Sequence, residues 1–197
     1  PNTPGLRQLQ EREPLLALLR ACVARLAERA PGKPLLLKFA PDLEPEAMDE
    51  LVDVAIAAGI SGLVATNTTV SRLGVESHPR AKEAGGLSGA PLERLATAAV
   101  RRCYARAGGR LVIVGCGGIL TAEDAYAKIR AGATLVQGYS GLIFQGPRYA
   151  RAIHDGLVAL LRRDGFTSLE EAVGADHRRT DALDGASALP PGGVGPP

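Results

Sequence analysis

Short apolar runs alternate along the chain with longer segments in which apolar residues recur at helical spacing. Continuous apolar runs of this length are typical of strands that are covered on both faces, as in parallel sheets. The runs predict strands near residues 34–39, 62–66, 111–115 and 134–138. We therefore expect an α/β fold in which four parallel strands lie in chain order with helices outside, because crossovers between parallel strands are right-handed.

Apolar positions three and four residues apart predict helices between these strands. The stripes are Leu15, Leu18, Leu19, Cys22 and Leu26; Met48, Leu51, Val52 and Ala55; Leu92, Leu95, Ala96, Ala99 and Cys103; and Tyr149, Ile153, Leu157 and Leu160. Thr121 and Asp124 have the spacing of a capping box, which predicts the start of a further helix. The stretch 68–90 is too long for a plain connection, and such stretches are lids, binding loops or disordered segments.

The composition excludes several classes of protein. Of the 197 residues, 46% are hydrophobic and 22% are charged, which is typical of globular domains and not of disordered or fibrous chains. The 23 basic and 21 acidic residues nearly cancel, and the chain has four Tyr, three Phe and no Trp. Neither a basic surface nor a set of stacking platforms for bases is expected, so we predict no nucleic-acid partner. No apolar run reaches the ~18 residues that a membrane span needs.

Cysteine and histidine usage argues against a disulfide framework and a metal site. The three cysteines are odd in number and scattered, so a reducing cytoplasm is the expected compartment. Cys22 and Cys103 fall on apolar helix stripes and are predicted core residues, while Cys116 is predicted to be a small packed residue in a glycine-rich turn. None of the histidines has a second ligand at metal spacing, so no metal site is predicted. They are His78, His154 and His177.

All four predicted strands end in residues that a plain apolar core would not select. In α/β barrels the chemistry lies at the carboxyl ends of the strands, and a phosphate site often follows the last two. Gly117-Gly118 follows the third predicted strand, and Tyr139-Ser140 follows the fourth. Either segment alone is explained by a tight turn. Together, with a helix starting near Thr121, they predict backbone N–H groups that hold a phosphate-bearing cofactor or substrate.

The first two strand ends offer a cation and an amide, and each has two interpretations. Lys38 is the only charge in its apolar run. It either extends to solvent or holds its ammonium group beside an electron-rich group that gains negative charge. Asn67, between Thr66 and Thr68, is either a turn residue or a donor and acceptor for a planar polar ligand.

Read together, these segments resemble class 2 (quinone-dependent) dihydroorotate dehydrogenase. The match runs from residue 1 to about 178 and the motifs follow in the family's order, so no single motif carries it. They are Pro1-Asn2-Thr3-Pro4-Gly5-Leu6-Arg7, Lys38-Phe39-Ala40-Pro41-Asp42-Leu43, Ala65-Thr66-Asn67-Thr68-Thr69, Gly85-Gly86-Leu87-Ser88-Gly89, Gly115-Cys116-Gly117-Gly118-Ile119, Leu135-Val136-Gln137-Gly138-Tyr139-Ser140 and Gly174-Ala175-Asp176-His177-Arg178.

The resemblance implies a (β/α)₈ TIM barrel that binds FMN. Such an enzyme oxidises dihydroorotate to orotate in de novo pyrimidine (UMP) biosynthesis and passes the electrons to a quinone. The four strands expected here would form the C-terminal half-barrel, over residues 1–175. Residues 176–197 would form a disordered, Pro/Gly-rich tail.

The same resemblance assigns roles to residues of this chain. Lys38 would lie beside the flavin ring and stabilise its anionic reduced form, and Thr66 would touch the flavin. The ring edge, ribityl chain and phosphate would be held by Ser88, Gly89, Gly117, Gly118, Tyr139 and Ser140. The substrate would be bound by Asn2, Asn67 and Thr68. The family's flexible active-site loop would fall at about residues 69–87.

The largest departure from the family concerns its first half. The family's general base is a serine directly before the Pro-Asn-Thr turn, a position that would precede Pro1, so we predict no catalytic base within this chain. The first four strands and the N-terminal helices, which form the quinone tunnel and the membrane contact, would also lie outside it. The full-length family member would be peripheral on the cytoplasmic side of the cell membrane, and this chain has no membrane element of its own.

Two other interpretations stay open at this point. The chain could be an inactive fragment that at most binds flavin phosphate, and its open strand edges would then favour self-association. It could also belong to a different FMN-dependent barrel oxidoreductase, although the joint presence of Asn2, Lys38 and Asn67 speaks against that.

Overall fold

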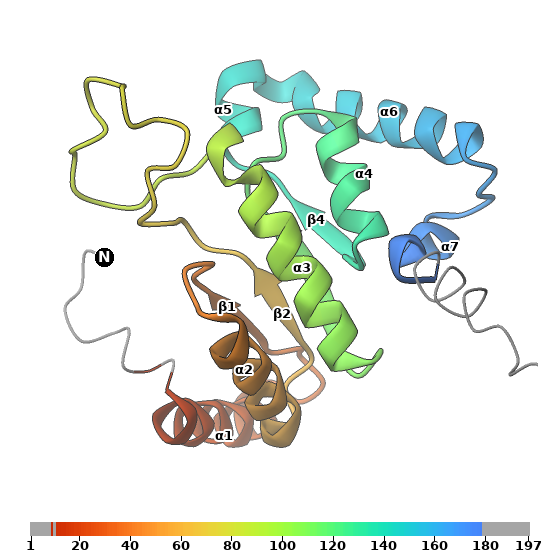
Figure 1. Ribbon diagram of the computed structural model, residues 1–197. Helices are drawn as coiled ribbons and strands as arrows, with labels where there is room; N and C mark the ends of the chain where they lie inside the picture. The colour runs from red at the N-terminus through yellow and green to blue at the C-terminus, as the bar shows by residue number, and fades with distance from the viewer. Residues whose placement is uncertain (1–8, 10, 179–197) are drawn as a thin grey trace, which may run out of the picture.

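The computed structural model describes residue 9 and residues 11–178 (Figure 1). Its elements are, in chain order, α1 (Arg12–Arg29), β1 (Leu36–Phe39), α2 (Pro45–Ala58), β2 (Gly62–Ala65), the 3₁₀ turn η2 (Ala90–Leu92), α3 (Glu93–Ala107), β3 (Val112–Cys116), α4 (Ala122–Arg130), β4 (Leu135–Gln137), α5 (Ser140–Gln145), the 3₁₀ turn η3 (Gly146–Arg148), α6 (Tyr149–Arg163) and α7 (Leu169–Ala172). None of the helices in this part of the chain is long and apolar enough to cross a membrane.

The four strands form one parallel sheet in the order β1-β2-β3-β4, which confirms the predicted topology. The register pairs Lys38 with Val64 and Val64 with Val114, and Val114 in turn pairs with Leu135. The carboxyl ends of all four strands therefore lie along one edge of the sheet. In the described part of the chain, β1 and β4 each pair with a single neighbour.

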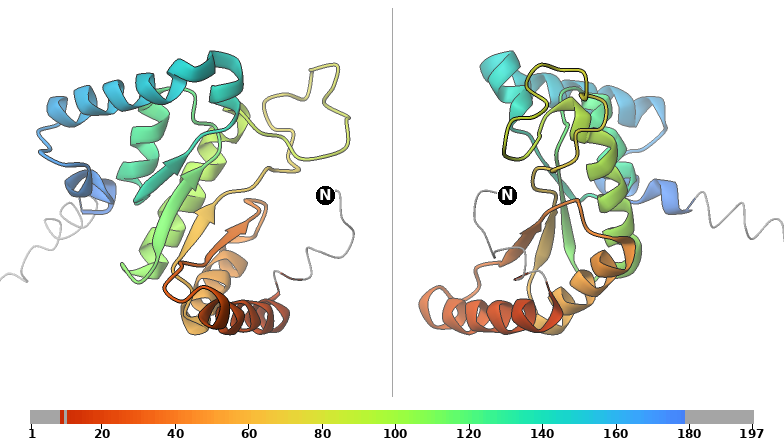
Figure 2. Two further views of the ribbon diagram at one scale, coloured as in Figure 1. Left: turned by 180° about the vertical axis from the view of Figure 1, so that it is seen from behind. Right: turned by 60° about the vertical axis from the view of Figure 1, so that its left-hand side comes forward.

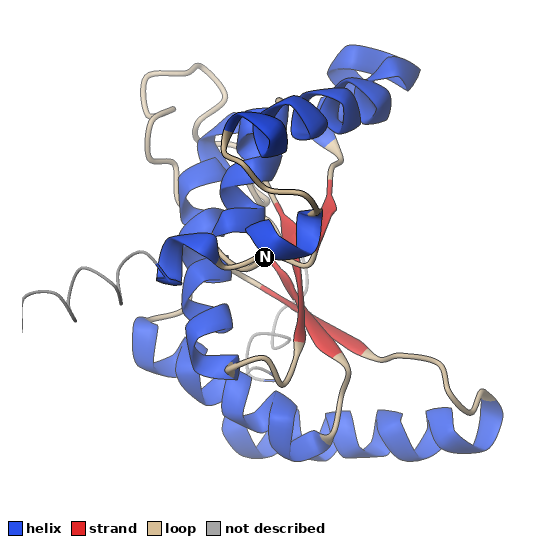
Figure 3. Ribbon diagram, turned by 90° about the vertical axis from the view of Figure 1, so that its right-hand side faces the viewer, coloured by secondary structure: helices blue, strands red, loops and turns tan. Residues whose placement is uncertain are grey.

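The two faces of the sheet differ in what covers them. Helices α2, α3 and α4 lie on one side of the strands (Figure 2), and the strand residues facing them, such as Phe39, Leu63 and Ile113, are buried. On the other face Val112 is 40% exposed and Leu135 is 58% exposed. Figure 3 shows no described helix over this face, between α1 and α6. The sheet thus has the single covered face of one half of a barrel.

Most residues of the apolar stripes are buried in the core, and α1 and α3 contain exceptions. The core of α3 is centred on Ala96, Val100 and Cys103, which leaves Leu95 at the side of the helix and 38% exposed. In α1 only Leu15 and Leu19 are buried, because this helix packs on α2 along one narrow side at the end of the sheet. The prediction that Cys22 is a core residue was therefore wrong, because Cys22 is half-buried, and Leu18 of the same stripe is 42% exposed.

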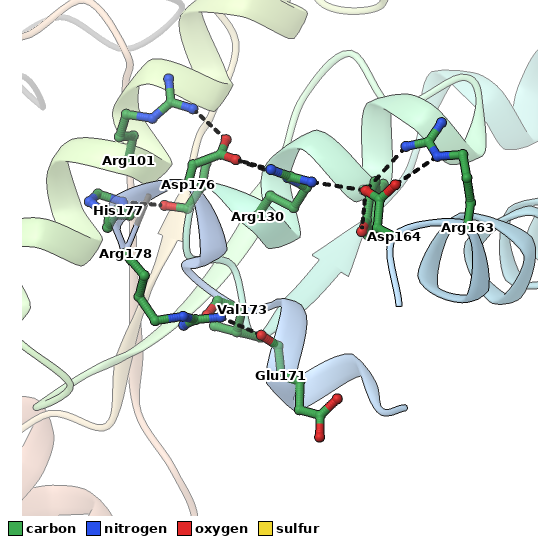
Figure 4. Close-up of polar contacts among 11 residues, drawn as sticks. Arg101, Arg130, Arg163, Asp164, Glu171, Val173, Asp176, His177 and Arg178 are labelled. Carbon is green, nitrogen blue, oxygen red and sulfur yellow. Dashed lines mark hydrogen bonds and ion pairs between the residues drawn. The ribbon is translucent and has the colours of Figure 1, made fainter. Parts of the chain in front are cut away.

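The end of the folded unit lies further along the chain than predicted. A tail starting at residue 176 was expected, but Asp176 accepts hydrogen bonds from Arg130 at 2.7 and 2.9 Å and from Arg101 at 2.9 Å (Figure 4). His177 packs against the ring of Tyr104, with 5.0 Å between ring centroids. The predicted tail was therefore wrong at its first residues, because charged and aromatic partners from α3 and α4 hold Asp176 and His177 in place. The rest of the predicted tail lies outside the described residues.

Candidate functional site

A cavity of about 170 Å³ opens at the carboxyl ends of the four strands. Every site residue predicted from the sequence lines it, except Asn2, which lies outside the described residues. The predicted residues that line it are Lys38, Thr66, Asn67, Thr68, Ser88, Gly89, Gly117, Gly118, Tyr139 and Ser140. The fold thus brings together segments that are far apart in the sequence, while what each residue binds stays a prediction.

Lys38 supplies the positive charge of the cavity. It is the third residue of β1, on the sheet face that no described helix covers, and its Nζ donates to Cys116 Sγ at 3.8 Å. Cys116 is the last residue of β3 and is 9% exposed, so it is packed as predicted and also lines the cavity. The ammonium group stands at the cavity and is available to a ligand there, which favours the second interpretation of this lysine.

The segment after β2 is held by its neighbours on both sides. Thr66 N–H donates to the carbonyl of Cys116 at 2.7 Å, and Asn67 N–H donates to the carbonyl of Phe39 at 2.7 Å. The peptide bond between Ala65 and Thr66 is cis. The Oδ1 atom of Asn67 accepts the N–H of Thr68 at 2.9 Å, so this residue shapes the turn and lines the cavity at once. The two interpretations of Asn67 are therefore compatible.

The turn after β3 requires glycine. Gly117 and Gly118 have φ values of +119° and +70°, which side chains rarely adopt. A Cβ atom on Gly118 would also stand 2.3 Å from Glu93 Cα, at the start of α3. Helix α4 begins shortly afterwards with the predicted capping box, in which Thr121 and Asp124 exchange side-chain and backbone bonds. A glycine turn followed by a capped helix start is an arrangement that suits an anion.

Tyr149 connects this turn to the segment after β4. Its hydroxyl donates to the carbonyl of Ile119 at 2.8 Å. Its side chain packs against Gly138 and Gly141: a Cβ atom on Gly138 would be 2.2 Å from the hydroxyl oxygen, and one on Gly141 would be 2.4 Å from the ring carbon Cε2. Burial raises the pKa of this phenol, which keeps it protonated as a donor. The sequence indicated Tyr149 only as an apolar helix residue. The signal that was missed is the pair of glycines that its ring requires.

A long segment connects β2 to η2 (Figure 1). Ser88 and Gly89 near its end line the cavity. The two ends of the segment are joined by paired backbone bonds between Thr69 and Leu87, at 3.1 and 2.7 Å. Asp42, after β1, accepts the hydroxyl of Thr69 and the N–H of Val70. The loop is thus fastened to the sheet at its base.

Inside the loop, the guanidinium of Arg72 donates hydrogen bonds to several backbone carbonyls. It donates to those of Ala81, Glu83 and Gly85 at 3.0, 2.9 and 2.8 Å. These bonds fold residues 72–85 into a connected unit at the edge of the site. Of the alternatives left open for this segment, a structured binding loop or lid fits these contacts.

The chemistry of the cavity is cationic and hydroxyl-rich. Among the residues that the structure describes, its lining contains one lysine and no carboxylate. Over the same residues no cluster of three or more His, Cys, Asp or Glu side chains could hold a metal ion. Away from the cavity, burial raises the pKa of the Cys103 thiol to about 12, so this cysteine is a core residue without thiolate reactivity.

Comparison with known proteins shows which sequences this chain resembles. The family model for dihydroorotate dehydrogenase matches residues 1–161. A "Dihydroorotate dehydrogenase (quinone)" from Anaeromyxobacter dehalogenans (strain 2CP-C) is 74% identical over 179 residues, which are 91% of this chain and 49% of that protein. One with the same name from Myxococcus xanthus is 56% identical over 92% of this chain and 50% of its own length. The chain thus spans about half the length of these curated relatives.

Comparison of the fold with solved structures finds proteins of the same name. The crystal structure of DHODH from Eimeria tenella in complex with ferulenol superposes with a TM-score of 0.84 at 37% sequence identity, over 90% of this chain and 52% of that one. A ligand-free form of the same protein gives 0.83 at 38% identity. The match of the family model over most of the sequence, together with these relatives, shows that the chain belongs to the dihydroorotate dehydrogenase family.

Proposed function

We propose that this chain supplies the flavin and substrate contacts of a quinone-dependent dihydroorotate dehydrogenase, which oxidises dihydroorotate to orotate. The observation that carries the proposal is the meeting of four separate strand ends in one cavity. Each of these ends brings a polar or glycine segment that the family resemblance had singled out. A cavity formed by chance would not be lined by all of these segments, nor would its described lining be free of Asp and Glu side chains.

The lining fits FMN, which the resemblance implies as the cofactor. FMN carries a phosphate dianion and a hydroxylated chain, and the cavity offers hydroxyl groups, one ammonium group and no carboxylate among its described lining residues. Gly89, Gly117 and Gly118 all have positive φ, which lets backbone approach a ligand where a side chain would not fit. When bound, the flavin supplies a hydride acceptor.

The chain's own residues would bind and orient the reactants. Gly117 and Gly118 with Tyr139 and Ser140 would hold the phosphate end, and Lys38 would place a positive charge where negative charge develops. Asn67 and Thr68 would present amide and hydroxyl groups to the substrate, together with Asn2. Contacts with quinone and with the cytoplasmic face of the membrane would be made by the half of the curated relatives that this chain does not match.

The family resemblance gives proton removal to a residue outside the described lining. Oxidation of dihydroorotate requires a base near the ring carbon that loses a proton. By the resemblance this base is a serine directly before the Pro-Asn-Thr turn, and the described residues that line the cavity include no carboxylate and no imidazole that could replace it. We therefore propose that the 197 residues alone do not oxidise dihydroorotate, and that activity requires the first half of the barrel.

A chimera tests the proposal directly. This chain would replace the matching 179-residue region of the Anaeromyxobacter dehalogenans relative. We expect the purified chimera to show flavin absorbance that orotate perturbs, and to reduce quinone with dihydroorotate, while the 197-residue chain alone does not. A folded chimera without flavin absorbance would contradict the proposal.

A further inference from the structure

A lysine is completely buried behind the site. Lys128, in α4, is 0% exposed. An ammonium group in such a place is costly unless hydrogen bonds and an opposite charge compensate it. Its burial lowers its pKa, and the nearby carboxylate of Glu93 acts in the opposite direction. Lys128 does not line the cavity, so the function proposed above leaves its presence unexplained.

The partners of Lys128 all lie in the first turn or so of α3. Its Nζ donates to Thr97 Oγ1 at 2.8 Å and to the carbonyl of Glu93 at 3.3 Å, and it lies 3.7 Å from Glu93 Oε1. The hydroxyl of Thr97 donates in turn to Glu93 Oε1 at 2.9 Å. Lys128, Glu93 and Thr97 therefore form a closed set of contacts, called here the α3 clamp.

The α3 clamp packs against β3 and against the Gly117-Gly118 turn, which is one wall of the cavity. The stem of Lys128 packs against β3, where a Cβ atom on Gly115 would be 3.1 Å from Lys128 Cβ and Cδ. On the other side, Gly118 lies so close to Glu93 that its Cβ would be 2.5 Å from Glu93 N. The position of Glu93 thus decides where the turn at Gly118 can lie.

The start of α3 also positions the second wall of the cavity, at Ser88 and Gly89. Ser88 and Gly89 come directly before η2, which runs into α3 at Glu93. Because that connection is a single turn, a shift of Glu93 would move Ser88 and Gly89 as well as the surface against which Gly118 packs. One buried group thereby controls the spacing of two cavity walls that are far apart in the sequence.

We propose that Lys128 is a positioning residue for the phosphate-bearing cofactor, acting through Glu93 and Thr97 on the Gly117-Gly118 turn and on Ser88-Gly89. The proposal rests on the function proposed above, with FMN as the ligand. It assigns no contact between Lys128 and the cofactor. The charge and the length of Lys128 hold the start of α3 at one distance from β3, so that the cofactor meets a preformed site.

The test uses the chimera with variants of two clamp residues and a matched control. Lys128→Met removes the ammonium group and keeps the stem, and Thr97→Val removes one hydroxyl at nearly constant volume. Thr97→Ser keeps the hydroxyl. Tyr126→Phe, on the same helix, removes a partly buried hydrogen bond to Asp164 at the end of α6, and neither residue lines the cavity. FMN affinity is measured by fluorescence titration of the flavin-free protein, alongside thermal stability.

We expect Lys128→Met and Thr97→Val to weaken FMN binding about tenfold, since each leaves buried polar groups unpaired and lets the helix start move. Thr97→Ser should restore the affinity of the parent. Tyr126→Phe should lower the melting temperature without changing the affinity. Unchanged FMN affinity in both clamp variants would overturn the proposal, as would an equal loss of affinity in Tyr126→Phe.

Hydrogen exchange of the flavin-free protein separates this proposal from the function itself. Thr97→Val should speed exchange of the amides of residues 117–118, and Tyr126→Phe should not. Unchanged exchange in Thr97→Val would refute the α3 clamp, whatever the protein binds. A parent protein that binds no FMN but shows this change in exchange would instead overturn the proposed function and keep the clamp.

Discussion

The hydroxyl of Tyr149 donates a hydrogen bond to the carbonyl oxygen of Ile119 across 2.8 Å, which joins the segment after β3 to the segment after β4. The residues at the two ends of this bond belong to elements separated by the whole of α4, β4 and α5. A buried side chain therefore helps to hold together the last two strand ends, where a phosphate site is expected.

Tyr149→Phe is expected to destabilise the protein by about 1–2 kcal/mol, because the carbonyl of Ile119 loses its buried donor. FMN affinity should fall as well, since one of the hydrogen bonds that join the two walls is lost, while that from Gln145 to the carbonyl of Leu120 remains. Urea unfolding and fluorescence titration of the chimera measure the two effects. A variant with the stability and the FMN affinity of the parent would show that the bond does not hold the site.

Lys38→Met should lower kcat/KM of the chimera by about 10²–10³-fold, because a fixed positive charge is removed from where negative charge develops. The fold should be unaffected, since Lys38 lies on the open face of the sheet. Lys33→Met is the control, because Lys33 is an exposed lysine before the start of β1, at the opposite end of the strand. Equal activity of the two variants would remove Lys38 from the mechanism.

Gly118→Ala combines backbone strain with a collision. The side chain would be forced to adopt φ +70° and would meet Glu93. Gly109→Ala introduces the strain alone, since Gly109 has φ +79° and a Cβ atom added there would meet nothing within 4 Å. We expect Gly109→Ala to cost about 1–2 kcal/mol of stability without altering FMN affinity. Gly118→Ala should cost more stability and also abolish FMN binding. The pair is compared by urea unfolding and fluorescence titration.

Because of Asp164, the free energy of unfolding is expected to depend on pH in the acidic range. Its hydrogen bond from Arg163, with a further one from Tyr126, lowers the pKa of this carboxyl to about 2 from an ordinary value of 3.8. A depressed pKa in the folded state stabilises the protein above the unfolded-state value, and that stability is lost as the pH falls through the folded-state value. Asp164→Asn should therefore melt below the parent at pH 7. The difference between the two should shrink between pH 4 and about pH 2, as followed by circular dichroism.

The 197-residue chain expressed alone is expected to self-associate. In the described residues β1 and β4 each have one unpaired edge, and Leu36, Val112 and Leu135 are exposed on the open face of the sheet. Sedimentation velocity at micromolar concentration should show oligomers, and Leu135→Lys should raise the fraction of monomer. A monodisperse monomer would contradict this expectation.

Local patterns predicted most of the secondary structure, and they erred where burial depends on a distant partner. The spacing of Leu92, Ala96, Ala99 and Cys103 located α3 correctly, but it could not show that Leu95 lies outside the contact with the sheet. The composition of the last residues indicated a tail from residue 176. It could not show that Arg101 and Arg130 reach Asp176 from two other helices.

The sequence by itself determined the strands, their order and the kinds of residue at their carboxyl ends, because the alternation of apolar runs with helical periods is a local property and right-handed crossovers leave few topologies. Only the tertiary structure decided that Tyr149 binds Ile119 and that Lys128 is buried against Glu93 and Thr97. Such pairs join residues about a whole strand–helix unit apart. They depend on the distances between packed helices and strands, and the periodicity of apolar residues along the chain does not specify those distances.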